Sequence, residues 1–116
     1  MRAVEVGDLG LVEMAGGALT PLAWHRAFPD EVDLFEAVAA MERASRRKGA
    51  AIPSLTVLRV AYALAWTADY AAGRQTPPFE RWLASAGAVN VATLVSEVDG
   101  EVVAGLLRGE DAQEKA

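Results

Sequence analysis

The sequence contains no cysteine and only one histidine, His25. Without cysteine, the chain has neither disulfides nor thiolate metal sites, which suits a reducing compartment. A lone imidazole has no second histidine with which to share a metal ion, so we assign His25 no role. The glycine spacing does not form a phosphate-binding loop, and no serine lies in a nucleophile elbow. We therefore expect no catalytic residues, no metal and no cofactor, and hence a protein that is not an enzyme.

Basic residues are in the minority, with 11 Lys and Arg against 16 Asp and Glu, so the net charge is -5. An acidic chain is repelled by nucleic acid phosphates and by anionic lipid surfaces, which favours a protein partner. The exception is a basic run that comprises Arg43, Arg46, Arg47 and Lys48. Because Gly49 follows as a stop signal, we interpret this run as cations at a helix C-terminus. Contact with a phosphate or an acidic protein is the alternative.

No apolar run is long enough to cross a membrane. The longest, from Leu55 to Ala68, carries only the charge of Arg59, but at about fourteen residues it falls short of the ~20 that a span needs. At the N-terminus, Glu5 and Asp8 interrupt any signal-peptide pattern. We therefore expect no membrane contact and a cytoplasmic location.

The length of 116 residues suits one domain. We expect a single helical domain over residues 1–109 and a disordered polar tail over 110–116. Alternating Val4 and Val6, followed by Gly7, Asp8 and Gly10, predict a short hairpin within residues 3–14.

Two helices should follow the hairpin. Thr20 and Pro21 predict the start of a short helix that covers residues 22–28, with the Thr20 hydroxyl as its cap. Asp30 is predicted to cap the next helix. Its apolar stripe down to Arg46 has spacings of three and four and consists of Leu34, Phe35, Val38 and Met41. The acidic cluster of Asp30, Glu31, Asp33 and Glu36 is interpreted as helix-stabilising charge rather than as a metal or acid/base site.

Residues 55–72 should form a long helix that Ser54 caps and Gly73 ends. This helix is apolar nearly all round, so it lies either at the centre of the fold or at a contact with another subunit. Thr76, Pro77 and Pro78 predict the start of a further helix with Thr76 as its cap. Its apolar residues, which should dock back on the long helix, are Phe79, Trp82 and Leu83.

For the last segment two readings compete. Asn90 can cap a final helix whose apolar spacing persists to Leu106. Alternatively, Asp99 and Gly100 form the turn of a hairpin. The helix is favoured because the spacing of three and four continues across Gly100. The fold class is therefore mainly α, a small bundle of about four to five helices with an N-terminal hairpin.

Hydrophobic residues make up 53% of the chain, which leaves surplus apolar surface for an interface. We select Trp66, Tyr70 and Trp82, which lie at the break between two predicted helices, as protein-binding candidates.

One stretch is similar to a known family. "LRVAYALAWTADYAAGRQTPPFERWLASA", from Leu58 to Ala86, resembles the central signature of tail assembly chaperones of long-tailed (siphovirus-type) bacteriophages and their prophages. That signature has a Leu-, Ala- and aromatic-rich helix that ends near an acidic residue, here Asp69, and a Pro-containing loop before an amphipathic piece, here "FERWL". Upstream, "LTPLAWHRAFPDEVDLFEAVAAME", from Leu19 to Glu42, is similar to the family's segment after an N-terminal hairpin.

The resemblance implies a non-enzymatic chaperone in the cytoplasm of the host cell. It would bind the helical tape measure protein, keep it soluble and help to recruit tail tube subunits, the major tail protein. Homo-oligomerisation is left open. A small helical structural subunit of the particle, such as a head-tail connector or a tail-completion protein, is the alternative.

Overall fold

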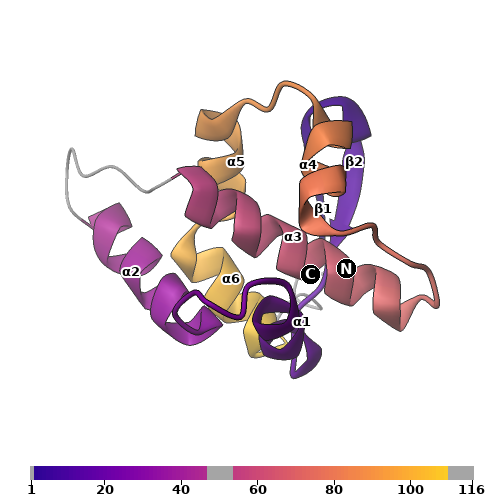
Figure 1. Ribbon diagram of the computed structural model, residues 1–116. Helices are drawn as coiled ribbons and strands as arrows, with labels where there is room; N and C mark the ends of the chain where they lie inside the picture. Colours follow the sequence, from indigo (N-terminus) through magenta and orange to yellow (C-terminus); the bar gives the residue numbers. More distant parts are fainter. Residues whose placement is uncertain (1, 47–53, 110–116) are drawn as a thin grey trace.

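The computed structural model describes residues 2–46 and 54–109. Within these ranges the chain forms a two-stranded hairpin, a short 3-10 helix and six α-helices (Figure 1). Their bounds are β1 Arg2–Glu5, η1 Gly7–Leu9, β2 Leu11–Met14, α1 Leu19–Ala27, α2 Leu34–Arg46, α3 Ser54–Ala71, α4 Phe79–Ala86, α5 Val91–Glu97 and α6 Gly100–Leu107. The prediction of a mainly helical fold with an N-terminal hairpin is confirmed.

The hairpin pairs β1 with β2 in an antiparallel register that sets Val4 opposite Val12. Val4, Val6 and Met14 are buried, as expected when alternate residues of a strand face the core. Just after β2, the backbone amide of Ala15 donates a hydrogen bond of 3.1 Å to the carbonyl of Leu64 in α3. The hairpin is therefore joined directly to the central helix.

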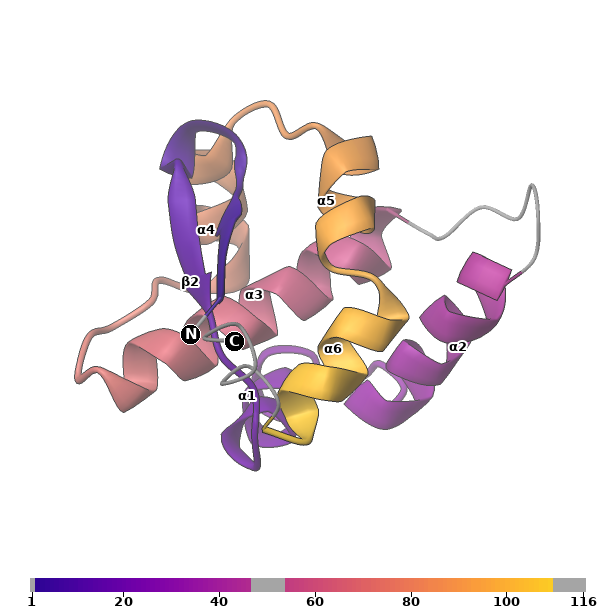
Figure 2. The ribbon, with the colours of Figure 1, turned by 180° about the vertical axis from the view of Figure 1, so that it is seen from behind.

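Helix α3 runs through the middle of the molecule, with the other elements around it in both views (Figures 1 and 2). The five consecutive residues from Ala61 to Ala65 are all buried, and five residues exceed one turn of 3.6. The fold itself thus covers every side of the middle of the helix, as the first of the two sequence-based alternatives predicted, whereas Leu55 and Tyr70 near its ends are exposed. Among the described helices, none combines the length and the apolar character that a membrane crossing requires.

An aromatic cluster joins α1, α3 and α4. The ring of Phe28 lies edge-on to the rings of Trp24 and Phe79, with centroids 5.1 and 5.0 Å apart. Tyr62 of α3 packs edge-on against Phe79 and Trp82 of α4, at 5.3 and 5.4 Å. Such pairs contribute ~0.5–1.5 kcal/mol each beyond the area they bury. The predicted docking of α4 on the long helix is confirmed.

Two predicted helix starts are wrong in detail. Thr20 is a buried residue inside α1, where its hydroxyl donates to the carbonyl of Ala15 at 3.2 Å, and the N-cap is Ala18. In front of α2, the cap is Asp33 rather than Asp30, because the Glu36 amide donates to the Asp33 carboxylate at 2.8 Å. In the first case a tertiary contact competes for the hydroxyl. In the second, an equivalent acidic side chain lies closer to the helix.

The apolar stripe of α2 differs from the predicted one at a single position. Phe35 is 60% exposed, whereas Leu34, Val38 and Met41 are buried as predicted. The buried set also contains Ala37, which lies three residues after Leu34 and completes the face. A small residue fits this position because α2 packs closely against its neighbours, and the bulky ring of Phe35 points away.

The final segment forms two helices, α5 and α6, where the sequence predicted one helix or a hairpin. Asn90 caps α5 as predicted, since its side chain accepts a hydrogen bond from the Thr93 amide at 3.2 Å. Asp99 then has an extended backbone, and its carboxylate accepts from the Val102 amide at 2.9 Å. Asp99 therefore begins a new helix with Gly100 as its first residue. Both the unbroken helix and the hairpin turn are wrong.

Some predictions concern the part of the chain outside the described residues. They are the basic residues Arg47 and Lys48, the stop signal at Gly49 and the disordered tail over 110–116. The side chain of Ser54 is likewise not described. These remain predictions.

Candidate functional site

Two of the three residues selected from the sequence form one exposed pair. Trp66 and Tyr70 lie one turn apart on α3, and their rings stack with centroids 4.9 Å apart and planes 16° apart. Trp66 is partly buried and packs against the core, while Tyr70 is 55% exposed. The pair thus has a supported inner ring and an outer ring that faces solvent. Its role in partner binding remains a prediction.

The third candidate, Trp82, lies almost entirely in the core and reaches this surface only where it lines a hollow beside the hairpin. It is only 4% exposed, because it packs against Tyr62 and forms part of the aromatic cluster. Its indole therefore stabilises the fold and exposes little area to a partner, and its role in partner binding remains a prediction. The sequence could not separate it from Trp66, since both lie on apolar faces beside the same break between helices.

Two adjoining hollows lie beside the aromatic pair. The first, here named the aromatic hollow, has a volume of about 300 Å³ and is lined by Trp66, Tyr70, Arg74, Gln75 and Thr76. The second, the hairpin hollow, has a volume of about 450 Å³ and is lined by Leu9, Leu11, Val12, Glu13, Asp69, Arg74, Thr76, Pro77, Trp82 and Ser85. Arg74 and Thr76 line both hollows, so these two residues form the wall between them.

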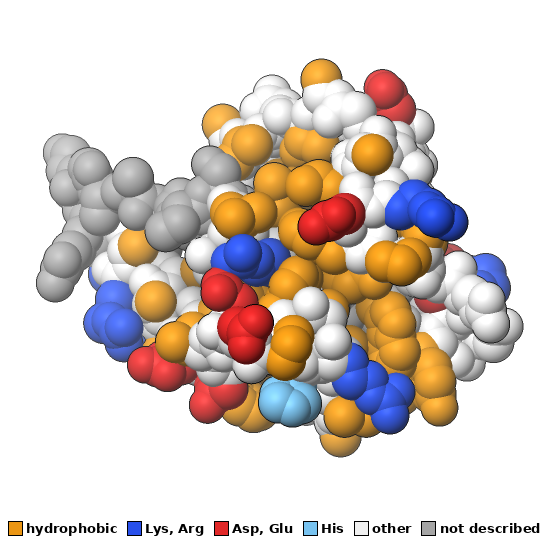
Figure 3. Space-filling model, viewed as in Figure 1, with side chains coloured by type: hydrophobic (Ala, Val, Ile, Leu, Met, Phe, Trp, Pro, Cys, Tyr) orange, Lys and Arg blue, Asp and Glu red, His pale blue; other side chains and the backbone are white. Residues whose placement is uncertain are grey.

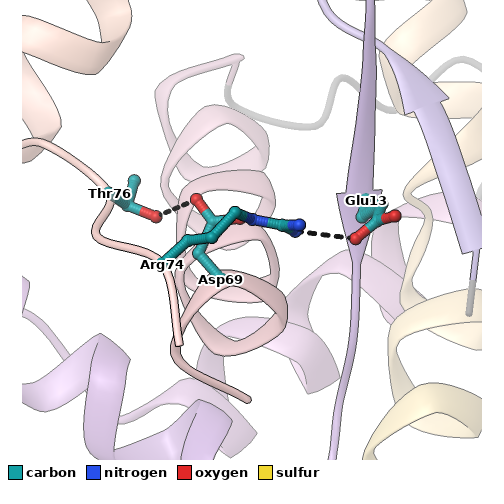
Figure 4. Close-up of polar contacts among 4 residues, drawn as sticks. All are labelled: Glu13, Asp69, Arg74 and Thr76. Carbon is teal, nitrogen blue, oxygen red and sulfur yellow. Dashed lines mark hydrogen bonds and ion pairs between the residues drawn. The ribbon is translucent and has the colours of Figure 1, made fainter. Parts of the chain in front are cut away.

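A network of polar side chains builds this wall (Figure 4). Arg74 donates from Nε to Asp69 Oδ1 at 3.1 Å and from Nη2 to Glu13 Oε2 at 2.8 Å. The Thr76 hydroxyl donates to the other carboxylate oxygen of Asp69 at 2.5 Å. The hydrogen bonds to Glu13 and Asp69 raise the pKa of the Arg74 guanidinium above its ordinary value, so it stays cationic. The network ties together β2, the end of α3 and the connector to α4.

The local sequence explains how Arg74 comes to face Asp69. Gly73 has a φ of 77°, which a residue with a side chain rarely adopts. Its amide donates to the Tyr70 carbonyl at 3.1 Å, and the Arg74 amide donates to the Asp69 carbonyl at 2.8 Å. This pair of bonds is the Schellman helix ending, which reverses the chain within two residues. The predicted stop at Gly73 is confirmed.

The connector after Arg74 is held at two more points. The Tyr62 hydroxyl donates to the Pro77 carbonyl at 2.8 Å, and burial raises the pKa of the Tyr62 phenol above its ordinary value of 10.0. Thr76 does not cap α4, since its hydroxyl is bonded to Asp69 and the N-cap residue of that helix is Pro78. The predicted cap is therefore wrong, because the helix end of α3 takes the hydroxyl.

Sequence reasoning missed the polar wall and the exposed side chain of Leu11. Leu11 lines the hairpin hollow and is 73% exposed. Glu13 and Arg74 are separated by 61 positions, so no local spacing could have predicted their ion pair. The only available signal was Asp69, the acidic residue at the predicted end of the long helix.

The remaining charged candidates are engaged in local structure. Asp33 caps α2, and Glu31 forms an ion pair with Arg59 of α3. Within residues 2–46 and 54–109, no group of three or more acidic or imidazole side chains is arranged to hold a metal ion. His25 is exposed on α1.

Hydrophobic side chains gather in a broad area over α3 on the face drawn in Figure 3, with acidic and basic side chains around it. A surface of this kind suits contact with another protein, whose apolar side chains can cover it. Comparisons of the chain with protein-family models, with curated proteins and with solved structures find no match.

Proposed function

We propose that this protein is a non-enzymatic binding module that serves as a tail assembly chaperone of long-tailed phages or prophages, with the tape measure protein as its partner. The observation that carries the proposal is the half-exposed, stacked pair of Trp66 and Tyr70 beside two adjoining hollows. The pair lies within the stretch from Leu58 to Ala86 that resembles this family.

The chemistry of the surface suits a helical partner. Tryptophan and tyrosine are enriched among the residues that dominate binding energy, because their rings bury a large area at a small entropic cost. An amphipathic helix binds by inserting apolar side chains, spaced three and four residues apart, into such hollows. The resemblance implies a tape measure protein that is long, largely helical and apolar on its surface.

The polar groups of the site support a binding role rather than a catalytic one. Arg74, Asp69 and Thr76 are bonded to one another, and Glu13 holds the far side of the guanidinium. A general base or nucleophile would have to face the place of a substrate, whereas these groups face each other. We therefore assign them to the shape and charge of the surface.

Co-expression with the neighbouring long helical open reading frame, followed by size-exclusion chromatography, tests the proposal. The partner should be insoluble alone and should co-elute with this chain. Tyr70→Ala should weaken the complex about tenfold or more, as is typical of an interface anchor. Phe35→Ala is the matched control, because Phe35 is a similarly exposed aromatic residue on α2 that lines neither hollow.

The alternatives give different results. If the partner is soluble without this chain, and this chain is found in purified particles, the structural-subunit function replaces the chaperone. If the complex forms but tolerates Tyr70→Ala as well as it tolerates Phe35→Ala, the chaperone role stands and the binding site lies elsewhere. Circular dichroism of both variants would establish that they are folded.

A further inference from the structure

Arg74 lines both hollows, as Thr76 does. Its side chain is 53% exposed, yet it reaches from the connector to Glu13 on the strand β2. Since Arg74 lines both hollows, a change in its side-chain rotamer would alter the shape of both. Because half of the Arg74 side chain faces water, tight packing does not hold it in one rotamer, as it would hold a buried side chain.

The backbone that carries the two carboxylates is positioned independently of Arg74. Glu13 lies on β2, whose register with β1 sets it opposite Ala3. Asp69 lies in the last turn of α3, and its second oxygen accepts the Thr76 hydroxyl. When Arg74 moves away, both carboxylates therefore remain within reach of the hollow, because β2 and the end of α3 keep their places. They would then face the hollow as a pair of negative charges beside the apolar side chains of Leu11 and Val12.

We propose that Arg74 occupies the position that a basic side chain of the partner takes upon binding. The partner segment is an amphipathic helix with a Lys or Arg between apolar residues. Its cation pairs with Glu13 and Asp69 and displaces Arg74 into solvent, while its apolar side chains contact Leu11 and Tyr70 on the two sides of the wall. This inference rests on the proposed helix-binding function and names the chemistry of the bound segment.

Charge complementarity argues for a basic occupant. The structure itself shows that the two carboxylates accept a guanidinium, with hydrogen bonds of 3.1 and 2.8 Å. Exchange of one cation for another leaves the number of ion pairs unchanged, and an exposed pair gives up little when it opens. The net charge of -5 attracts a basic segment and repels an acidic one, including a second copy of this chain.

The test uses two designed, fluorescently labelled helical peptides of about 18 residues, or some five turns. They share one leucine stripe and differ only at the central position, which is Lys in one and Gln in the other. Fluorescence anisotropy measures their binding to the full chain at low and high salt. The variants are Arg74→Gln and Glu13→Gln. The matched controls, Arg81→Gln and Glu80→Gln, change the same charges on exposed positions of α4.

The two substitutions, at Arg74 and at Glu13, should change binding of the Lys peptide in opposite directions. Arg74→Gln removes the competitor and should strengthen binding of the Lys peptide about two- to fivefold, the effect of one exposed ion pair. Glu13→Gln should weaken it by a similar factor. The Gln peptide should not respond to Glu13→Gln, and neither control variant should change binding of the Lys peptide. Higher salt should reduce the advantage of the Lys peptide.

Three outcomes would overturn the inference. They are weaker or unchanged binding of the Lys peptide to Arg74→Gln, equal responses of the two peptides to Glu13→Gln, and the absence of saturable binding of the Lys peptide to both the natural chain and Arg74→Gln. Thermal unfolding of each variant separates a loss of fold from a loss of binding. The co-elution experiment is independent of these peptides, so the proposed function can stand when this inference fails.

Discussion

Replacement of Gly100 by alanine would measure how closely α6 crosses α2. Helix propensity alone favours alanine over glycine by up to about 1 kcal/mol. The tertiary structure argues the other way, because a Cβ atom at Gly100 would lie 2.6 Å from the backbone nitrogen of Glu42 and 2.9 Å from its Cα. Real Cβ contacts are essentially never below 3.0 Å, so one of the two helices must shift.

The magnitude follows from these opposing effects. Overpacking of this kind costs about 1–3 kcal/mol. Because two of the short contacts are with backbone atoms, the cost lies in the upper part of that range, about 2–3 kcal/mol, and subtraction of the gain of ~1 kcal/mol in helix propensity leaves a fall in the free energy of unfolding of about 1–2 kcal/mol. For a chain of 116 residues this corresponds to a fall in the melting temperature of roughly 4–8 °C. Thermal and urea unfolding followed by circular dichroism would measure both quantities.

Two control variants separate the possible causes. Glu42→Ala removes the side-chain contact at 2.5 Å and leaves the backbone contacts, so the cost of Gly100→Ala should persist in that background. Gly10→Ala adds a Cβ with no atom within 4 Å at a φ of 70°, and so reports backbone strain alone. An unchanged or higher melting temperature for Gly100→Ala would refute the close crossing of α6 over α2.

Two further predictions concern the aromatic cluster. Trp82→Ala should lower the free energy of unfolding by about 3–5 kcal/mol, as for other buried aromatic residues. Phe35→Ala, at an exposed position, should change it by less than ~0.5 kcal/mol. Urea unfolding would measure both values, and equal effects would contradict the burial of Trp82. The raised pKa of Tyr62 means that the unfolded chain releases the phenolic proton at a lower pH than the folded chain does. The contribution of Tyr62 to stability should therefore be fully present below pH 10 and should be lost as the pH rises beyond it. Tyr62→Phe should be less stable at neutral pH, because it loses the hydrogen bond to the Pro77 carbonyl. Its free energy of unfolding should also fall less steeply at alkaline pH. Equal slopes for the variant and the natural chain would show that the Tyr62 phenol does not cause the alkaline fall.

The sequence by itself determined the features that depend on neighbouring residues. The helices α1 to α4 were predictable from the spacing of their apolar residues. The stop at Gly73 and the cap at Asn90 were predictable because each depends on the conformational preference of one residue or on a hydrogen bond within three positions. The central place of α3 was predictable as one of two alternatives. A cylinder that is apolar on every side must be covered, and the sequence shows that requirement without showing what does the covering.

Where a polar side chain could take part in more than one local structure, only the tertiary structure decided which one it forms. Thr20 and Thr76 both have the pattern of a helix cap, but each hydroxyl donates to a group outside the expected helix. The break at Asp99 depends on a carboxylate that could equally have served a turn. In each case two local structures have similar energies, and packing against the rest of the chain selects one.

The same reason applies to the candidate site. Trp66, Tyr70 and Trp82 have equivalent local sequence patterns, yet the aromatic cluster buries Trp82 and leaves Tyr70 at the surface. The wall between the hollows needs Glu13 and Arg74 side by side, which only the packing of β2 on α3 achieves. Local sequence determined which residues are apolar or charged; long-range packing decided which of them face solvent together.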